Sequence, residues 1–106
     1  MTVLEDADQI IEELQDIEKK VLLVLAKERI SSNNNIRQET ILKKLPDKDI
    51  QKGKKAINNL VKKGIIRKYR HKNYALDKIG VIIANKLKKS YQDESYKDIH
   101  ILFMIT

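Results

Sequence analysis

The 106-residue chain contains no cysteine and no tryptophan, one proline and only three glycines. Without cysteine, it can form neither a disulfide framework nor a thiolate metal site. The two histidines, His71 and His100, are far apart, and neither has a neighbour at metal-ligand spacing. Aromatic residues make up only 5% of the chain, which disfavours single-strand binding by base stacking. We therefore expect no metal ion and no cofactor.

Long hydrophobic runs are also missing. No apolar segment approaches the roughly 20 residues that a membrane span needs, and the sequence has no signal-peptide pattern. We therefore expect a cytoplasmic protein without a membrane segment. No nucleophile–base pairing and no glycine-rich phosphate loop stands out, so we do not expect an enzyme.

Charge is divided unevenly along the chain, whose formal net charge is +7. Residues 1–18 hold seven acids and no lysine or arginine, whereas residues 43–72 hold twelve basic residues and two acids. A run of charge is often only a solvated face. The concentration of positive charge in one 30-residue segment favours an anionic partner.

The first part of the chain has a helical hydrophobic period. Thr2 and Glu5 fit a capping box, and the acids near the start suit a helix dipole. The spacing predicts either one helix from residue 3 to about 28 or two helices, with Asp16 as the second N-cap. The second half is apolar around most of its circumference, which predicts burial. The stripe consists of Val3, Ala7, Ile10, Leu14, Ile17, Val21 and Val24.

A polar run at residues 31–35 is the clearest break in the sequence. A turn or short strand fits there, and Asn34 or Asn35 can cap a second helix over about 36–45. The inward positions expected for this helix are Ile36, Ile41, Leu42 and Leu45.

Pro46 enforces the next break because proline cannot continue a helix interior. Asp47 or Asp49 is then expected to cap a third helix over about 48–63. Gly53 within this helix predicts a close crossing with the preceding helix, where even a methyl group would not fit. The expected inward positions are Ile50, Gly53, Ile57, Leu60 and Val61.

Gly64 has the position of a helix-ending glycine, with lysines in the last turn before it. The β-branched residues that follow predict a hairpin with strands at about 65–70 and 74–77. Its tip is expected at residues 70–73, with Asn73 at positive φ.

The end of the chain combines one more helix with an apolar tail. Asp77 is expected to cap a helix over about 78–91, with Ile79, Ile82, Ile83, Leu87 and Tyr91 on one side. Residues 98–105 are very apolar, so they must pack on their own domain or on a partner.

Three pieces of sequence together resemble the winged-helix family, most closely the MarR-type repressors. These are INNLVKKGIIRK (57–68), the tip RHKN (70–73) and YALDKIG (74–80). Asp77 takes the place where the family usually has threonine, and either residue can cap a helix. The hairpin tip is shorter than the wing of typical MarR repressors.

The resemblance covers residues 17–90 and implies a mainly α fold with a small β-hairpin, a winged helix-turn-helix. The chain would add an N-terminal helical extension, residues 1–16, and a C-terminal apolar extension, residues 91–106. In MarR-like proteins such end segments supply a dimer interface. The resemblance thus implies a homodimer that binds double-stranded DNA and regulates transcription.

The resemblance also implies which side chains would contact DNA. Amides on the third helix would read adenine edges, and lysines would meet guanine or phosphate. Cations of the hairpin would anchor to phosphate or the minor groove, although charge on such strands also protects a sheet edge. For Lys43 and Lys44, a phosphate contact and a helix-end role are equally expected. The implied DNA-binding residues are Gln51, Lys52, Lys54, Lys55, Asn58, Asn59, Lys62, Arg67, Lys68, Arg70 and Lys72.

Two other functions remain open at this point. Winged helices also serve as protein-docking modules, so the chain could belong to a transcription or other nucleic-acid-processing assembly. Binding to double-stranded RNA fits the charge, but no motif distinguishes it.

Overall fold

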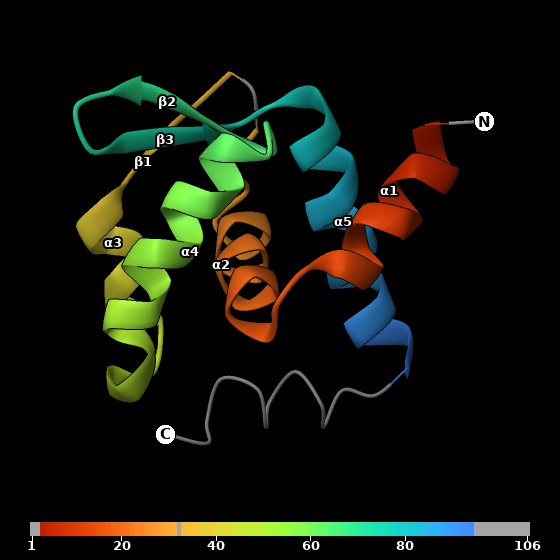
Figure 1. Cartoon of the computed structure of the whole chain (residues 1–106), viewed down its shortest axis with the longest axis horizontal. Coiled ribbons are helices and arrows are strands. Elements are labelled where there is room, and N and C mark those ends of the chain that lie inside the picture. Colours follow the sequence, from red (N-terminus) through yellow and green to blue (C-terminus); the bar gives the residue numbers. More distant parts are fainter. Residues whose placement is uncertain (1–2, 32, 95–106) are drawn as a thin grey trace.

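The structure is organised around α2 (Asp16–Lys27), which is covered on nearly all sides (Figure 1). The computed structural model describes residues 3–31 and 33–94, with the side chains of residues 6–31 and 33–90. The six consecutive apolar residues 21–26 are each at most 6% exposed. Helices α3, α4 and α5 all pack against α2, as its all-round apolar surface predicts.

The fold is mainly helical, with a small antiparallel sheet of three strands in the order β1-β3-β2. None of the helices in the described part of the chain is long and apolar enough to cross a membrane. The elements, in chain order, are α1 (Val3–Glu13), α2 (Asp16–Lys27), β1 (Ile36–Arg37), α3 (Gln38–Lys43), the 3-10 helix η1 (Asp47–Asp49), α4 (Ile50–Lys62), β2 (Ile66–Arg70), β3 (Asn73–Leu76) and α5 (Lys78–Glu94).

The first two helices are separate, which decides between the two alternatives left open by the sequence. The chain breaks at Leu14 and Gln15, and the expected N-cap at Asp16 is wrong because Gln15 is the capping residue. The Gln15 backbone N–H donates to the carboxylate of Glu18 at 2.9 Å, so the acid three residues later closes the turn. The capping box at Thr2 lies outside the described residues.

Helix α1 packs against α5 of the same chain, and Ala7 is fully buried there. An ion pair of 2.6 Å joins the Asp8 carboxylate to the Lys86 ammonium. The apolar stripe of α1 therefore packs against α5 of the same chain. Pairing of α1 and of residues 91–106 with a second copy stays a prediction, and residues 95–106 lie outside the described part.

The second predicted helix begins later than expected. Ile36 is buried, but it belongs to β1 and pairs with Tyr74 of β3. Helix α3 starts only at Gln38. Neither asparagine caps it: the Asn34 side-chain oxygen accepts from the backbone N–H of Ser31 at 2.6 Å. The asparagine therefore closes the loop before the strand, because an extended backbone at 36–37 leaves no helix start within its reach.

Helix α4 also starts two residues later than predicted, since 47–49 form η1. Asp49 does occupy the N-cap position, but it makes no capping hydrogen bond. Its carboxylate instead accepts from the Lys20 ammonium at 2.8 Å. The carboxylate that we expected to cap α4 is therefore bound by Lys20, 29 residues away in the sequence.

The close crossing predicted at Gly53 is confirmed. A Cβ placed there would lie 2.6 Å from Leu45 Cδ1 and 3.0 Å from Leu42 Cδ2. Of the other inward positions predicted for α4, Ile57 and Leu60 are fully buried. Ala56, which the sequence pattern did not single out, is buried with them at 1% exposure.

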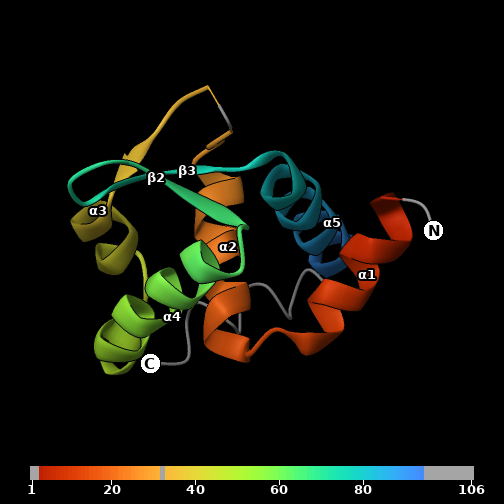
Figure 2. The same ribbon diagram turned by 45° about the horizontal axis from the view of Figure 1, so that its top comes forward.

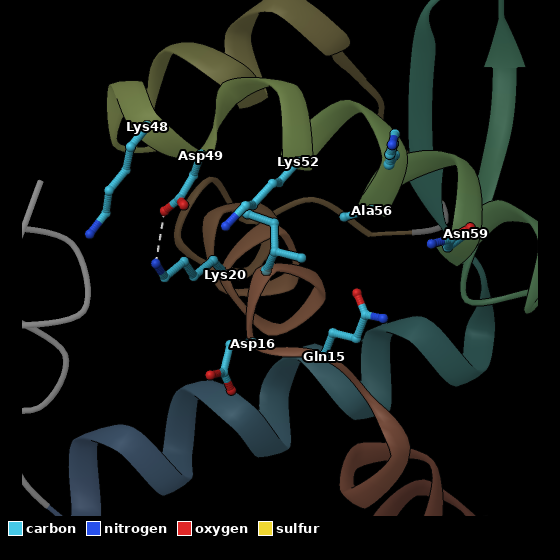
Figure 3. A pocket seen from close by; sticks show the side chains of 10 residues that line it. Gln15, Asp16, Lys20, Lys48, Asp49, Lys52, Ala56 and Asn59 are labelled. Atoms are coloured by element: carbon cyan, nitrogen blue, oxygen red, sulfur yellow. Dashed lines mark hydrogen bonds and ion pairs between the residues drawn. The ribbon is translucent and has the colours of Figure 1, made fainter.

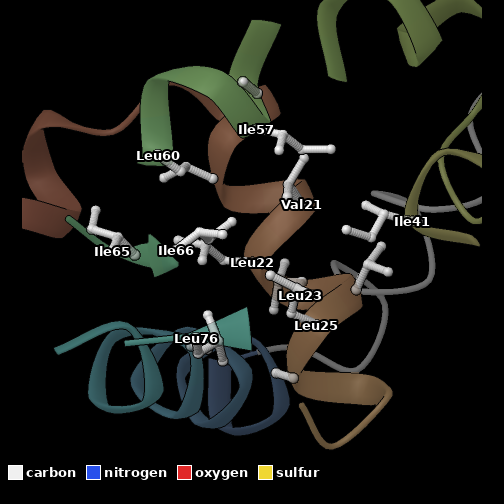
Figure 4. Close-up of a cluster of buried hydrophobic side chains, with 14 of the residues drawn as sticks. Val21, Leu22, Leu23, Leu25, Ile41, Ile57, Leu60, Ile65, Ile66 and Leu76 are labelled. Carbon is white, nitrogen blue, oxygen red and sulfur yellow. The ribbon is translucent and has the colours of Figure 1, made fainter. Parts of the chain in front are cut away.

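Gly64 ends α4 as predicted, with a φ of +77°. The backbone N–H of Gly64 donates to the Val61 carbonyl, and that of Ile65 donates to the Leu60 carbonyl, both at 3.0 Å. This pair of hydrogen bonds is a Schellman motif. It turns the chain directly into the hairpin, so Ile65 and Ile66 enter the core beside Leu22 (Figure 4).

The start of α5 is fastened to the start of the hairpin. The Ile65 carbonyl accepts from the backbone N–H of Asp77 at 3.0 Å, and the Asp77 carbonyl accepts the first helical bond, from Val81, at 2.9 Å. Asp77 thus has the predicted position before α5, but its carboxylate accepts from the adjacent Lys78 N–H at 2.9 Å and not from the second or third helical N–H, as a capping side chain does. One turn on, a Cβ at Gly80 would fall against the same Ile65 carbonyl oxygen. The helix therefore approaches the backbone closely enough to require glycine.

We predict that Gly80→Ala destabilises the protein more than Gly53→Ala. At Gly80 the new methyl meets a backbone carbonyl that cannot move without breaking a turn, which we expect to cost about 1–3 kcal/mol. At Gly53 it meets the ends of two leucine side chains, which can shift. Both glycines lie in helices, so the gain of about 1 kcal/mol in helix propensity applies to both variants and the difference comes from the contacts. Urea unfolding of both variants measures the difference; equal losses would contradict the assignment.

Candidate nucleic-acid interface

Helix α4 has one buried side and one polar side. Gly53, Ala56, Ile57 and Leu60 face the core. The seven predicted residues lie on the other side, and all are exposed except Asn59, which is partly buried. The helix thus presents amides and ammonium groups together, as the sequence predicted. These residues are Gln51, Lys52, Lys54, Lys55, Asn58, Asn59 and Lys62.

The β2–β3 hairpin follows directly from α4, and its four predicted cationic residues, Arg67, Lys68, Arg70 and Lys72, are all exposed. The strand pairing is irregular between Lys68 and Arg70. Tyr69, in that irregularity, is 54% exposed, and the guanidinium carbon of Arg70 lies 5.5 Å from the centre of its ring. The sequence pattern did not predict this exposed aromatic side chain.

The residue at positive φ in the hairpin turn is Lys72, at 59°, and not Asn73 as expected. Asn73 is the first residue of β3 and pairs with Arg37 and Arg70, so its backbone is extended. The backbone N–H of Gln38, the first residue of α3, donates to the Lys72 carbonyl at 2.9 Å. The turn is therefore docked on α3 at the residue that has the left-handed conformation (Figure 2).

A groove of about 680 Å³ lies where the turn, α3 and the start of α4 meet. The predicted residues Lys54 and Lys72 both line it, together with Arg37, Lys43 and His71. Sequence reasoning missed Arg37 because it placed this residue inside a helix. Lys43, for which two roles were equally expected, lies in the groove.

Lys44, the neighbour of Lys43, is paired instead. Its ammonium lies 2.9 Å from the Glu28 carboxylate, so this lysine links the end of α3 to the end of α2. The two lysines that the sequence treated alike therefore have different surroundings.

A second hollow, of about 720 Å³, lies on the other flank of α4, against η1 and the start of α2 (Figure 3). Lys52, Lys55 and Asn59 line it, together with Lys48 and the ion-paired Lys20. By helical geometry, the other predicted α4 residues, Gln51, Asn58 and Lys62, lie on the ridge between the two hollows.

The acidic and basic segments of the sequence lie apart in the structure. Helix α1, with exposed acids such as Asp6, Glu12 and Glu13, lies at the opposite end of the molecule from the hairpin turn in both views (Figures 1 and 2). The cationic face of α4 and the hairpin is therefore kept away from the acidic helix. Such an arrangement attracts a polyanion to one end.

The described residues contain no group of three or more His, Asp or Glu that could hold a metal ion. Comparison of the chain with protein-family models, with curated proteins and with solved structures gave no match in any of the three. What the chain does must therefore be inferred from its own geometry.

The turn geometry leads to a paired prediction. We expect Lys72→Gly to raise the free energy of unfolding by up to about 1 kcal/mol, because glycine relieves the cost of a left-handed conformation. Asn73→Gly should lower it, since β3 gains backbone freedom and loses a side chain. Thermal and urea unfolding of the two variants give the comparison, and the reverse order would show that Asn73 is the residue under strain.

Proposed function

We propose that this chain is a winged-helix protein that binds double-stranded DNA sequence-specifically and regulates transcription. The observation that carries the proposal is the shared exposure of the α4 amides and lysines beside a cationic hairpin. Affinity from phosphate contacts and specificity from base edges need these two kinds of side chain on one surface.

The order of elements supports the winged-helix part of the proposal. A buried helix, a short strand, two further helices and a hairpin follow one another as α2, β1, α3, α4 and β2–β3. The short strand pairs with the second hairpin strand, giving the order β1-β3-β2. In this scheme α3 and α4 form the helix-turn-helix, α4 is the recognition helix and the hairpin is the wing.

The ridge of α4 supplies the chemistry of base reading. Gln51 and Asn58 are exposed amides, and such amides can pair with the N6 and N7 edge of adenine. Lys62 lies on the same ridge and can reach guanine or phosphate. In the proposed complex this ridge enters the major groove.

The groove between the turn and α3 supplies the phosphate contacts. Arg37, Lys43, Lys54 and Lys72 bring four cations to its walls. Glu39 also lines the groove, 3.9 Å from the Arg37 guanidinium, and both side chains are exposed. The excess of cations suits a backbone phosphate, and the hairpin then anchors while the helix reads.

Dimerisation through the terminal segments remains part of the proposal, because symmetric operators need two half-sites about one helical turn apart. Selection of bound sequences from random duplexes would test the proposal directly. A palindromic result, together with a dimer mass in sedimentation, is the expected outcome.

We predict that replacing Lys54 and Lys55 by glutamate abolishes duplex binding while leaving the fold intact, since both side chains are exposed. Fluorescence anisotropy with a labelled duplex measures the binding, and circular dichroism checks the fold. The matched control replaces Lys78 and Lys89, which are exposed on α5, with the same change of charge. Equal loss in both proteins would mean that only net charge matters, and no binding by the unaltered protein at low salt would refute the proposal.

Salt dependence gives a second prediction. Affinity should fall linearly in a log–log plot against salt, with a slope near −0.9 for each phosphate contacted. Lys72→Ala should make the slope shallower by about one contact and weaken binding to all sequences alike. Gln51→Ala should leave the slope unchanged and relax the preference at one base position.

One observation favours a different function, a winged-helix module that docks another protein. Tyr69 exposes an aromatic ring on the edge strand of the hairpin, and aromatic residues are enriched at protein interfaces. Weak, salt-insensitive DNA binding together with a stoichiometric protein partner, lost on Tyr69→Ala, would support this alternative.

A further inference from the structure

Two ion pairs connect the start of α2 to the two ends of α4. The Lys20 ammonium lies 2.8 Å from the carboxylate of Asp49, directly before α4 (Figure 3). The Lys63 ammonium lies 2.8 Å from the carboxylate of Glu18, directly after α4. Both acids are largely withdrawn from water, with side chains 8% and 1% exposed.

Helical geometry explains how two residues so close in sequence reach opposite ends of another helix. Residues two positions apart project about 200° apart around a helix axis. Glu18 and Lys20 therefore point to opposite sides of α2. Figure 3 shows α4 crossing α2, which is seen nearly end-on, with Lys20 on the side of Asp49. Of the residues that flank α4, the acid, Asp49, precedes its amino end and the base, Lys63, follows its carboxyl end, which suits the α4 dipole.

Between the two ion pairs, α4 packs against α2 with apolar side chains. Ile57 and Leu60 are fully buried, and Figure 4 shows Ile57 beside Val21 of α2. Apolar helix pairs differ in crossing angle by about 15–20° from one example to another, so an apolar contact alone does not define one angle. In α4 the angle is set by the crossing with α3 at Gly53, by the junction with the hairpin at Gly64 and by the two ion pairs at its ends.

We infer that Glu18 and Asp49 are positioning residues, which hold α4 at the angle needed to read base edges. The inference rests on the proposed function. Neither acid lies on the exposed surface of α4, and both are nearly buried. We therefore expect them to control the specificity of binding and not its general affinity.

The lengths involved give the size of the effect. With 13 residues, α4 extends about 10 Å either side of its centre. A rotation of about 10° moves each end by nearly 2 Å, far more than a hydrogen bond to a base tolerates. Long lysine side chains follow such a displacement and keep their phosphates. Loosening α4 should thus remove base reading first.

The test uses Glu18→Gln and Asp49→Asn, which keep the shape of each side chain and leave the lysine partner a route to solvent. Each variant also removes one negative charge, so the net charge rises by one, which by itself would strengthen binding to every duplex. We expect affinity for the selected sequence to fall about tenfold while affinity for an unrelated duplex stays equal or rises. A parallel change in both affinities would overturn the inference.

The matched control is Asp8→Asn, which makes the same change of charge and breaks an ion pair of 2.6 Å between α1 and α5. It should leave the ratio of specific to unspecific affinity unchanged. If Glu18→Gln fails to fold, Asp49→Asn carries the test, because Asp49, directly before α4, is the less buried of the two acids. Circular dichroism establishes which variants are folded.

A distance measurement separates this inference from the proposed function. The chain has no native cysteine, so spin labels can be placed by Gln51→Cys on α4 and Asn85→Cys on α5, both exposed positions. We expect the distance distribution between the labels to broaden in Asp49→Asn but not in Asp8→Asn. An unchanged distribution would overturn the inference even if the protein binds DNA, whereas broadening in the labelled protein, together with no DNA binding by the unlabelled protein that retains Gln51, would refute only the proposed function.

Discussion

The constraint on which the rest of the structure depends is that residues 21–26 of α2 have no polar side. Six consecutive apolar residues on a helix point in every direction around the axis, so α2 must be covered all round. Helices α3, α4 and α5 provide that cover. Two polar residues in its first turns, Glu18 and Lys20, form ion pairs with residues at the ends of α4. Burial therefore places α4, and charge then aligns it.

Local signals in the sequence predicted much of the fold. The end of α4 at Gly64 and the two-stranded hairpin were predicted because glycine and β-branched residues act on the backbone within a few positions. A turn or short strand was expected at residues 31–35, but strand β1 lies at Ile36–Arg37, inside the predicted second helix. Its place could not be predicted, because a strand of two residues exists only through its partner: Ile36 pairs with Tyr74, 38 positions away. The cap expected at Asp49 failed for the same reason, since its carboxylate bonds to a distant lysine.

The sequence likewise predicted one part of the candidate interface and not another. Helical periodicity was enough to predict that the seven polar residues of α4 face outward, because an amphipathic helix has only one side to bury. The sequence could not predict that Lys54 and Lys72 line one groove with Arg37. That arrangement depends on contacts between residues far apart in the sequence: Arg37 pairs with Asn73 in the sheet, and the Gln38 N–H donates to the Lys72 carbonyl.

The carbonyl of Ile65 lies at a rigid junction between the hairpin and α5. The Asp77 N–H and the backbone of Gly80 both meet this one oxygen, so the hairpin and α5 are joined at their bases without a flexible linker. Helix α5 has 17 residues and spans about 25 Å, and α1 packs along it. A displacement of the hairpin would therefore be carried to the far end of the molecule. In the proposed DNA-binding dimer, built on that far end, this rigid connection would fix the distance between the two hairpins, and with it the spacing of the half-sites that the dimer could bind.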